Sequence, residues 1–290
     1  MQPVKQAFTP RQYMVTPDFE YFHYYDKSTV EVEYHNHDFY EIYFFISGSV
    51  TYIIEGKSYK LKPGDILLVH SRELHKPVIE SGESYQRIVL WVNPNFLKNR
   101  SIEGVNLSMC FEIDFPRRHN LLRPGSEMTA AIKSILNRFE RACSNSSFGN
   151  PLLRDLYLLE LIIYLNRAVL ETHEDDITID IEFNEKINSI IRYINENLCE
   201  ELLLDNISAR FFMSKYHLLR EFKKHTGFTI HKYICQKRLI AAKLMLKEGS
   251  SVTEACSKSG FNDYSNFIRS FKNAYGIPPR KYISSSRQGT

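Results

Sequence analysis

Four side chains between residues 35 and 75 have the types and spacing of a cation or polar-ligand site. The segment HNHDFYE places His35, His37 and Glu41 at even separations, so in a continuous strand all three would point to one face. His75 follows beyond the next turns. Two neighbouring imidazoles, a carboxylate and a distant imidazole could bind a cation. They could equally line a polar pocket or be satisfied core histidines.

A second strand offers two further candidates for ligand recognition. Arg87 and Trp91 have the same parity on QRIVLWV, so both would face one side of that strand. An indole packs over a sugar face, and a guanidinium binds hydroxyls or a carboxylate. Core packing of Trp91 is the alternative. The sequence offers no defensible nucleophile–base pair and no phosphate-binding glycine loop.

The elements around these residues have the pattern of a small β-domain. Between residues 30 and 92, short runs rich in Tyr, Phe, Ile and Val alternate with turn signals at Gly48, Glu55-Gly56-Lys57, Pro63-Gly64 and Asn93-Pro94. Several short strands at this spacing predict an antiparallel sandwich or barrel.

A helical pattern follows from about 126 to 170, ending in the very apolar DLYLLELIIYLNRAVL. This second helix is too apolar for a lone surface helix, so it either packs on the barrel or pairs with a second subunit. For the second case we expect charged substitutions at Leu159 and Ile163 to yield monomers.

Composition sets the class of protein. A chain of 290 residues predicts two domains at roughly 150 residues each, and 43% hydrophobic and 24% charged residues are typical of a globular protein. No apolar run approaches the ~20 residues of a membrane helix, and MQPVKQAFTP does not resemble a signal peptide. We therefore expect a cytoplasmic protein without a membrane partner. Its five cysteines form no CxxC pair, which indicates reduced thiols.

The charge is divided unevenly along the chain. Residues 184–290 hold 18 basic and 9 acidic residues, whereas the remainder is acidic, although the whole chain has a net charge of only +3. Between the two parts, 171–182 contain six acids and no Lys or Arg, which predicts a solvated linker. We expect a sensing and dimerisation domain at 1–170, a linker at 171–184 and a DNA-binding domain at 185–290.

An internal repeat defines the C-terminal part. The segment REFKKHTGFTIHKYI from Arg220 recurs 49 residues later as RSFKNAYGIPPRKYI from Arg269, with seven identical positions. Such a repeat indicates two copies of one supersecondary unit. In each copy a short helix, a turn, an N-capped second helix and a glycine stop predict a helix-turn-helix. The expected helices are 185–197, 203–211, 214–226, 230–248, 252–258, 263–275 and 279–283.

One face of each second helix should meet DNA. Leu218 and Phe222, like Phe267 and Phe271, are four apart and should face the core, which leaves cations and aromatic tips on another stripe. The connecting helix 230–248 would be roughly 28 Å long, comparable with the ~34 Å between successive major-groove faces. A purely structural helical bundle is the alternative. The expected DNA-binding residues are Ser214, Lys215, Tyr216, Leu219, Arg220, Lys223, Tyr264, Ser265, Asn266, Ile268, Arg269 and Lys272.

The string GFNDYSNFIRSFKNAYGIPPRKY, residues 260–282, resembles the second-unit signature of the AraC/XylS family of bacterial regulators. The resemblance covers about 100 C-terminal residues. It implies base contacts by Tyr216, Leu219 and Arg220 in the first unit and by Tyr264, Ser265, Ile268 and Arg269 in the second. Two departures are small: Ser208 and Cys256 replace a usual Ala, and Leu219 stands where a base-reading amide is common.

The N-terminal motif is similar to that of the cupin superfamily, in which HxH, three residues, Glu, six residues and Gly form a metal motif; here it ends at Gly48. The second cupin motif is degenerate, because His70 and Arg72 occupy its usual Pro and Gly positions. Since AraC/XylS regulators commonly carry such a domain as a metal-free effector pocket, the resemblance implies an effector, such as a sugar, near His35, His37, Glu41, His75 and Arg87. We accordingly expect no cofactor and little tightly bound metal, unless elemental analysis finds about one per chain.

Together these features predict an α+β protein: a cupin-like antiparallel β-barrel with flanking helices, followed by an all-α domain with two helix-turn-helix units. The expected function is sequence-specific transcription regulation in response to a small polar metabolite, as a homodimer, with double-stranded DNA and RNA polymerase as partners. The alternatives are a metal-dependent cupin enzyme with a helical appendage, which would leave the repeat unexplained, and an architectural DNA-binding protein without an effector.

Overall fold

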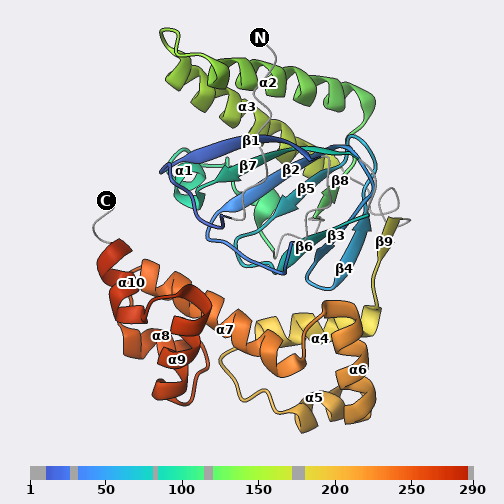
Figure 1. Cartoon of the computed structure of the whole chain (residues 1–290), viewed down its shortest axis with the longest axis vertical. Helices are drawn as coiled ribbons and strands as arrows, with labels where there is room; N and C mark the ends of the chain where they lie inside the picture. The colour runs from blue at the N-terminus through green and yellow to red at the C-terminus, as the bar shows by residue number, and fades with distance from the viewer. Residues whose placement is uncertain (1–10, 27–31, 81–83, 114–119, 172–179, 287–290) are drawn as a thin grey trace. The chain divides into compact units, whose positions relative to one another are not determined.

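The computed structural model describes residues 11–26, 32–80, 84–113, 120–171 and 180–286. They form a β-rich unit that ends at Glu182 and a helical unit that begins at Phe183 (Figure 1). Residues 1–10 and most of the expected acidic linker lie outside the described residues. No helix in the described part of the chain is long and apolar enough to cross a bilayer.

Two antiparallel sheets make up the β-rich unit. One has the strand order β1-β7-β2-β5-β8, and the other has the order β6-β3-β4-β9. The first sheet comprises β1 (Phe19–Asp26), β7 (Tyr85–Val92), β2 (Tyr40–Ser47), β5 (Ile66–Val69) and β8 (Leu121–Leu122). The second comprises β6 (His75–Ile79), β3 (Val50–Ile54), β4 (Lys57–Lys60) and β9 (Ile181–Glu182).

Strand parity divides the β-rich unit into two hydrophobic cores. On β2, Ile42 and Phe44 face the core shared with the helices, whereas Tyr43 and Phe45 face the interior between the sheets. Both faces of this strand are buried, because helices cover one side of the sheet and the second sheet covers the other. The odd-numbered residues therefore point to the place where a ligand cavity can form.

Helices α2 (Ser126–Ser144) and α3 (Asn150–Glu171) pack against the outer face of the first sheet (Figure 1). The short α1 (Pro94–Lys98) and η1 (Met109–Phe111) complete that core. The apolar residues of α3 fall into a buried group and an exposed group. Leu158, Leu161 and Leu165 are buried, but Leu156 and Ile163 are exposed by 50% and 39%.

Seven helices form the second unit, and each begins within one residue of its expected start. They are α4 (Glu185–Glu196), α5 (Leu204–Arg210), α6 (Lys215–Thr226), α7 (Ile230–Lys247), α8 (Val252–Lys258), α9 (Tyr264–Tyr275) and α10 (Pro279–Ser286). The agreement has a local cause. Ser214, Thr229, Ser251 and Asp263 each accept a backbone N–H as an N-cap, and Gly227 ends α6 with a left-handed φ of 76°.

The two helix-turn-helix turns use the same left-handed position differently. Two residues after α5 stands Phe212, with φ 51°, and two residues after α8 stands Gly260, with φ 89°. The Phe212 side chain is exposed, so only backbone strain opposes it. At Gly260 an added Cβ would lie 2.1 Å from the Leu198 carbonyl oxygen. The second turn therefore needs glycine for space as well as for φ.

The sequence analysis started the β-structure at residue 30 and assigned His75 to no strand. In the structure, strand β1 lies before residue 30, and β6 begins at His75 itself. The expected continuous strand from His35 to Glu41 was wrong: His35 forms an isolated bridge, and β2 begins only at Tyr40. The chain bends at residues 38 and 39, and His37 stacks on Phe39 there, with ring centroids 3.9 Å apart.

Candidate nucleic-acid interface and barrel site

The second helix of each helix-turn-helix presents one buried and one exposed face. Leu218 and Phe222 of α6 and Phe267 and Phe271 of α9 are fully buried, as the periodicity predicts. Eleven of the twelve expected DNA-binding residues are exposed, and Ile268 is half-buried. Tyr216 is exposed by 75% and Tyr264 by 50%, which is unusual for large aromatic side chains and is typical of a contact surface.

The paired arginines are held on this exposed face. Arg220 donates from Nε to Glu221 over 3.1 Å, and its side chain is 59% exposed. Arg269 donates to Asn266 Oδ1 over 3.3 Å. These are surface contacts within one helix and hold no two helices together. Both guanidinium groups are free to reach toward a base edge or a phosphate.

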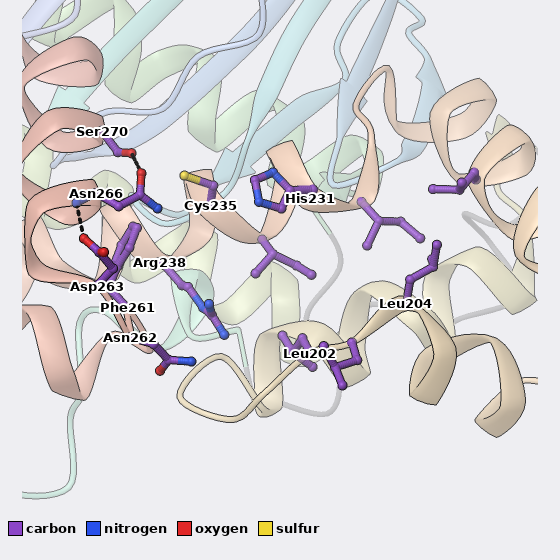
Figure 2. A pocket seen from close by; sticks show the side chains of 14 residues that line it. Leu202, Leu204, His231, Cys235, Arg238, Phe261, Asn262, Asp263, Asn266 and Ser270 are labelled. Atoms are coloured by element: carbon purple, nitrogen blue, oxygen red, sulfur yellow. Dashed lines mark hydrogen bonds between the residues drawn. The ribbon is translucent and has the colours of Figure 1, made fainter.

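A cleft of about 480 Å³ separates the two helix-turn-helix units. Figure 2 shows His231, Cys235 and Arg238 of α7 along it, with Asn266 of α9 on one side. Arg238 donates to the backbone oxygens of Leu198 and Glu200, which ties the chain before α5 to α7. Helix α7 has 18 residues and is therefore roughly 27 Å long, compared with the ~34 Å between successive major grooves.

The β-rich unit encloses a second cavity of about 290 Å³. This volume lies at the lower end of the range of about 300–1,000 Å³ for small-molecule pockets, so it suits a small ligand. His35, Glu41 and Arg87 line it, as does Trp91, in agreement with the parity of β7. His37 and His75 are not in its wall. Side chains that the sequence analysis missed also line it: Arg11, Tyr24, Tyr43, Tyr52 and Tyr85.

The polar side chains of the cavity wall are hydrogen-bonded to one another or packed on neighbouring rings. Arg87 donates to Asp26 over 2.5 Å, and its guanidinium lies 4.0 Å from the ring centroid of Tyr85. Tyr43 and Tyr85 share a hydrogen bond through their hydroxyls. Burial raises the pKa of Tyr85 to about 12, so its phenol remains neutral. The wall therefore combines neutral hydroxyls, flat rings and the guanidinium groups of Arg11 and Arg87.

The Glu41 side chain, also part of this wall, is held by two hydrogen bonds. Tyr52 donates to its Oε1 and Trp91 Nε1 donates to its Oε2, each over 3.0 Å. Burial opposes ionisation of Glu41, but the His37 side chain, with Nε2 3.4 Å from Oε2, holds the pKa of this carboxyl below its ordinary value. Its carboxylate is therefore charged and already bonded on both oxygens.

The three histidines converge beside Glu41. The rings of His35 and His75 are 4.3 Å apart, those of His37 and His75 are 4.9 Å apart, and one nitrogen from each ring lies within 4.8 Å of the others. A mutual backbone pair joins His35 to His75, with N···O distances of 3.1 and 3.0 Å. Burial, and then the neighbouring imidazole, lowers the pKa of both rings to about 4, so they are neutral near pH 7. Three imidazole nitrogens at this spacing could hold a divalent transition-metal ion.

Comparisons with known proteins agree with this geometry. Residues 17–162 match the family model of the AraC-like ligand binding domain, and residues 207–285 match that of a helix-turn-helix domain. A ligand-binding barrel joined to a duplicated helix-turn-helix defines a DNA-binding transcription regulator. Because the first match alone covers half of the chain, the protein belongs to the AraC family.

The curated relatives align with this chain over most of their length. The HTH-type transcriptional activator RhaS of Salmonella schwarzengrund is 25% identical over 254 residues, which is 85% of each chain, and RhaS of Salmonella arizonae is 25% identical over 251 residues. These relatives are regulators, and they give the enzyme alternative no support. Among solved structures, an apo ToxT variant of Vibrio cholerae aligns at 15% identity and a TM-score of 0.39, covering 94% of this chain and 98% of that chain. An AraC-type regulator of Chromobacterium violaceum aligns at 25% identity and 0.34, covering 37% of this chain and 96% of that chain.

Proposed function

We propose that each monomer reads two successive major grooves, one with α6 and one with α9. The observation that carries this proposal is the pair of matched exposed faces, on which Arg220 corresponds to Arg269 and Lys223 to Lys272, with an exposed tyrosine in the first turn of each helix. At about 10.5 base pairs per turn, two adjacent grooves give a footprint of roughly 20 base pairs per monomer. DNase I footprinting of an operator found by binding-site selection tests this, and protection of a single groove would contradict it.

Individual contacts divide into base readout and phosphate binding. Arg220 and Arg269 are each the sixth of the twelve residues of their helices, and their exposed guanidinium groups can reach guanine O6 and N7. Tyr216, Leu219, Ser265 and Ile268 supply further contacts to base edges. The N-cap end of α6 and the later turns suit phosphates, for which the contacts are Ser214, Lys215, Lys223, Asn266 and Lys272.

The barrel is the sensor in this proposal, and a small polyhydroxylated metabolite is its effector. Neutral tyrosine hydroxyls donate to and accept from sugar hydroxyls, aromatic rings cover the apolar sugar face, and Arg87 favours hydroxyls or a carboxylate. His35 and Glu41 border the same cavity. The relatives named RhaS are consistent with a sensor of this kind, but the effector itself is inferred from the cavity wall.

A panel of sugars and sugar acids tests the effector. A ligand present at 100 times its dissociation constant should stabilise the sensor by about 2.7 kcal/mol, which thermal denaturation detects as a rise in melting temperature. Tyr85→Phe removes one cavity hydroxyl and should weaken binding roughly five- to tenfold, because a net hydrogen bond contributes about 1 kcal/mol. Tyr40→Phe is the matched control, since Tyr40 stacks on Phe111 in the other core. If no compound in the panel raises the melting temperature, the effector belongs to another chemical class.

Dimerisation through α3 is part of the proposed function. Leu156, Ile163 and Leu170 are exposed and seven residues apart, and Leu152, 65% exposed, lies one turn before the first of them. An apolar stripe with this spacing is the pattern by which two helices pair side by side. The half-buried Leu159 lies between these residues and contributes to the monomer core as well.

Charged substitutions on the stripe should give monomers. We expect Leu156→Glu with Ile163→Glu to halve the mass in multi-angle light scattering and to weaken binding to a two-site operator, because two buried carboxylates would oppose the interface. Asn137→Glu on the exposed side of α2 is the control and should leave the mass unchanged. A wild-type chain that is monomeric at micromolar concentration would refute this pairing.

Three further parts of the proposal follow from the regulator class. The sensing and dimerisation domain is assigned to 1–170 and the DNA-binding domain to 185–290, with the residues between them as a connection. RNA polymerase is the expected protein partner of an activator, which is what the RhaS relatives are. The cytoplasm, where bacterial DNA is found, is the expected location.

A further inference from the structure

The guanidinium group of Arg220 has defined partners on its own helix. Its Nε donates to Oε1 of Glu221 over 3.1 Å, and its Nη2 lies 3.4 Å from Nδ1 of His217. The guanidinium carbon also lies 6.0 Å from the ring centroid of Tyr216. A guanidinium carries two N–H groups on each Nη, so Nη1 and Nη2 can still make the bidentate contact to guanine O6 and N7.

Glu221 has the wrong charge for a surface that meets DNA. It is the one acid among the twelve residues of α6, whose cations are Lys215, Arg220, Lys223 and Lys224. A carboxylate on this helix opposes the approach of phosphates and so lowers the affinity for DNA of every sequence. Its presence therefore needs a compensating role.

Stability of the fold does not supply that role. Arg220 is 59% exposed, and exposed ion pairs contribute little to stability. The other contact of the Glu221 carboxylate is with Nε2 of His225, 3.7 Å away and one turn later on the same helix. Neither contact joins α6 to another helix.

The matched position of the second unit has a related arrangement. The repeat places Ser270 of α9 where α6 has Glu221. Ser270 donates to Asn266 Oδ1 over 3.4 Å (Figure 2), and the same oxygen accepts from Nη2 of Arg269 over 3.3 Å. In each unit the residue after the arginine therefore helps to hold the guanidinium, directly in α6 and through Asn266 in α9.

Holding an arginine before it meets DNA has two consequences. An ordered side chain loses less rotamer entropy when it binds, so more of the contact energy remains for discrimination between bases. A bond at Nε also restricts rotation of the guanidinium toward neighbouring phosphates, which accept from it as readily as bases do. Because the bond to Glu221 is charge-assisted, it is stronger than the bond that Asn266 makes to Arg269.

We infer that Glu221 is a positioning residue for base readout: its carboxylate holds Arg220 through Nε and so increases sequence discrimination, while its charge lowers the affinity for DNA in general. The inference rests on the base contact proposed above for Arg220. Its two effects have opposite signs, which distinguishes positioning from a general electrostatic effect.

Two substitutions separate the hydrogen bond from the charge. Glu221→Ala removes both, whereas Glu221→Gln removes the charge and retains Oε1 as an acceptor for Nε. The full chain is titrated by fluorescence anisotropy against the selected operator and against a random-sequence duplex of the same length. We expect both variants to bind the random duplex about two- to threefold more tightly than wild type.

Only Glu221→Ala should lose discrimination. The ratio of operator affinity to random-duplex affinity should fall about five- to tenfold, because a hydrogen bond to a charged group is lost. Binding-site selection should confine this loss to the base positions that Arg220→Ala relaxes, and Glu221→Gln should keep most of the wild-type preference. Glu248→Gln, at an exposed acid that follows α7, removes the same charge outside both reading helices and should change neither quantity. All melting temperatures should stay within about 2 °C of wild type.

Three results would overturn the inference, and they differ in what they leave standing. If Arg220→Ala relaxes the base preference but Glu221→Ala does not, the base contact stands and the positioning role fails. If neither variant changes the preference, the base contact of Arg220 fails as well. Equal loss of preference in Glu221→Ala and Glu221→Gln would assign the effect to charge and not to the hydrogen bond.

Discussion

Gly260→Ala should lower the free energy of unfolding of the helical unit by about 3–5 kcal/mol, because two costs combine at this position. Its φ of 89° is unfavourable for a residue with a Cβ. The added Cβ would also lie 2.1 Å from the Leu198 carbonyl oxygen and 2.8 Å from Arg238 Nε. Backbone must move to relieve the first contact, which would break the hydrogen bond that Arg238 makes to the same carbonyl.

Gly276→Ala is the matched control. Gly276 ends α9 with a φ of 77°, but nothing lies within 4 Å of an added Cβ, so only the backbone cost of about 1 kcal/mol applies. Urea denaturation followed by circular dichroism measures the helices, and the fluorescence of Trp91 reports on the barrel. We expect Gly260→Ala to shift the unfolding transition seen by circular dichroism much further than Gly276→Ala does. The unfolding transition seen by Trp91 fluorescence should stay in place. Equal shifts for the two variants would show that Leu198 does not approach this turn so closely.

Arg269→Ala and Arg220→Ala should each weaken binding to the selected operator by about 1–3 kcal/mol and relax the preference at one or two base positions. The physical reason is the loss of a bidentate contact to guanine. Lys223→Ala and Lys272→Ala should behave differently. Their loss should weaken specific and non-specific DNA alike and reduce the slope of log K against log salt by about one unit.

Binding-site selection followed by fluorescence anisotropy at several salt concentrations distinguishes the two groups. Arg141→Ala, at an exposed position of α2 in the other unit, removes the same charge and serves as the control. An unchanged base preference together with a lowered melting temperature in the Arg220 and Arg269 variants would mean that these side chains stabilise the domain. The surface contacts of Arg220 with Glu221 and of Arg269 with Asn266 argue against that outcome.

The helical unit could be predicted almost completely, because its signals are local. N-caps such as Ser214 and Asp263 and glycine stops such as Gly227 act within one turn, and the spacing of Phe267 and Phe271 defines a buried face without reference to the rest of the chain. The barrel strands were predicted from alternation in the same way. Parity correctly placed Arg87 and Trp91 on the cavity side of β7.

Local sequence signals could not predict which distant side chains meet in the barrel. The expectation that His35, His37 and Glu41 share one strand face was wrong, because the chain bends between the bridge at His35 and the start of β2. The histidines meet because His75 pairs with His35 across the barrel. The tyrosines of the cavity come from β1, β2, β3 and β7, and only the parity of Tyr43 with Glu41 and of Tyr85 with Arg87 could have indicated two of them.

The sequence by itself determined the class of this protein: its residue patterns set the helices, the caps, the repeat, the exposed faces of α6 and α9 and the alternation of the strands. Tertiary structure decided what depends on contacts between distant segments. It buried one side of α3 and left Leu156 and Ile163 exposed, brought the Leu198 carbonyl against Gly260, and placed one ring nitrogen from each of three histidines within 4.8 Å of the others. Backbone preferences act over one turn of chain, whereas these positions depend on how sheets and helices pack over separations of 40 residues or more.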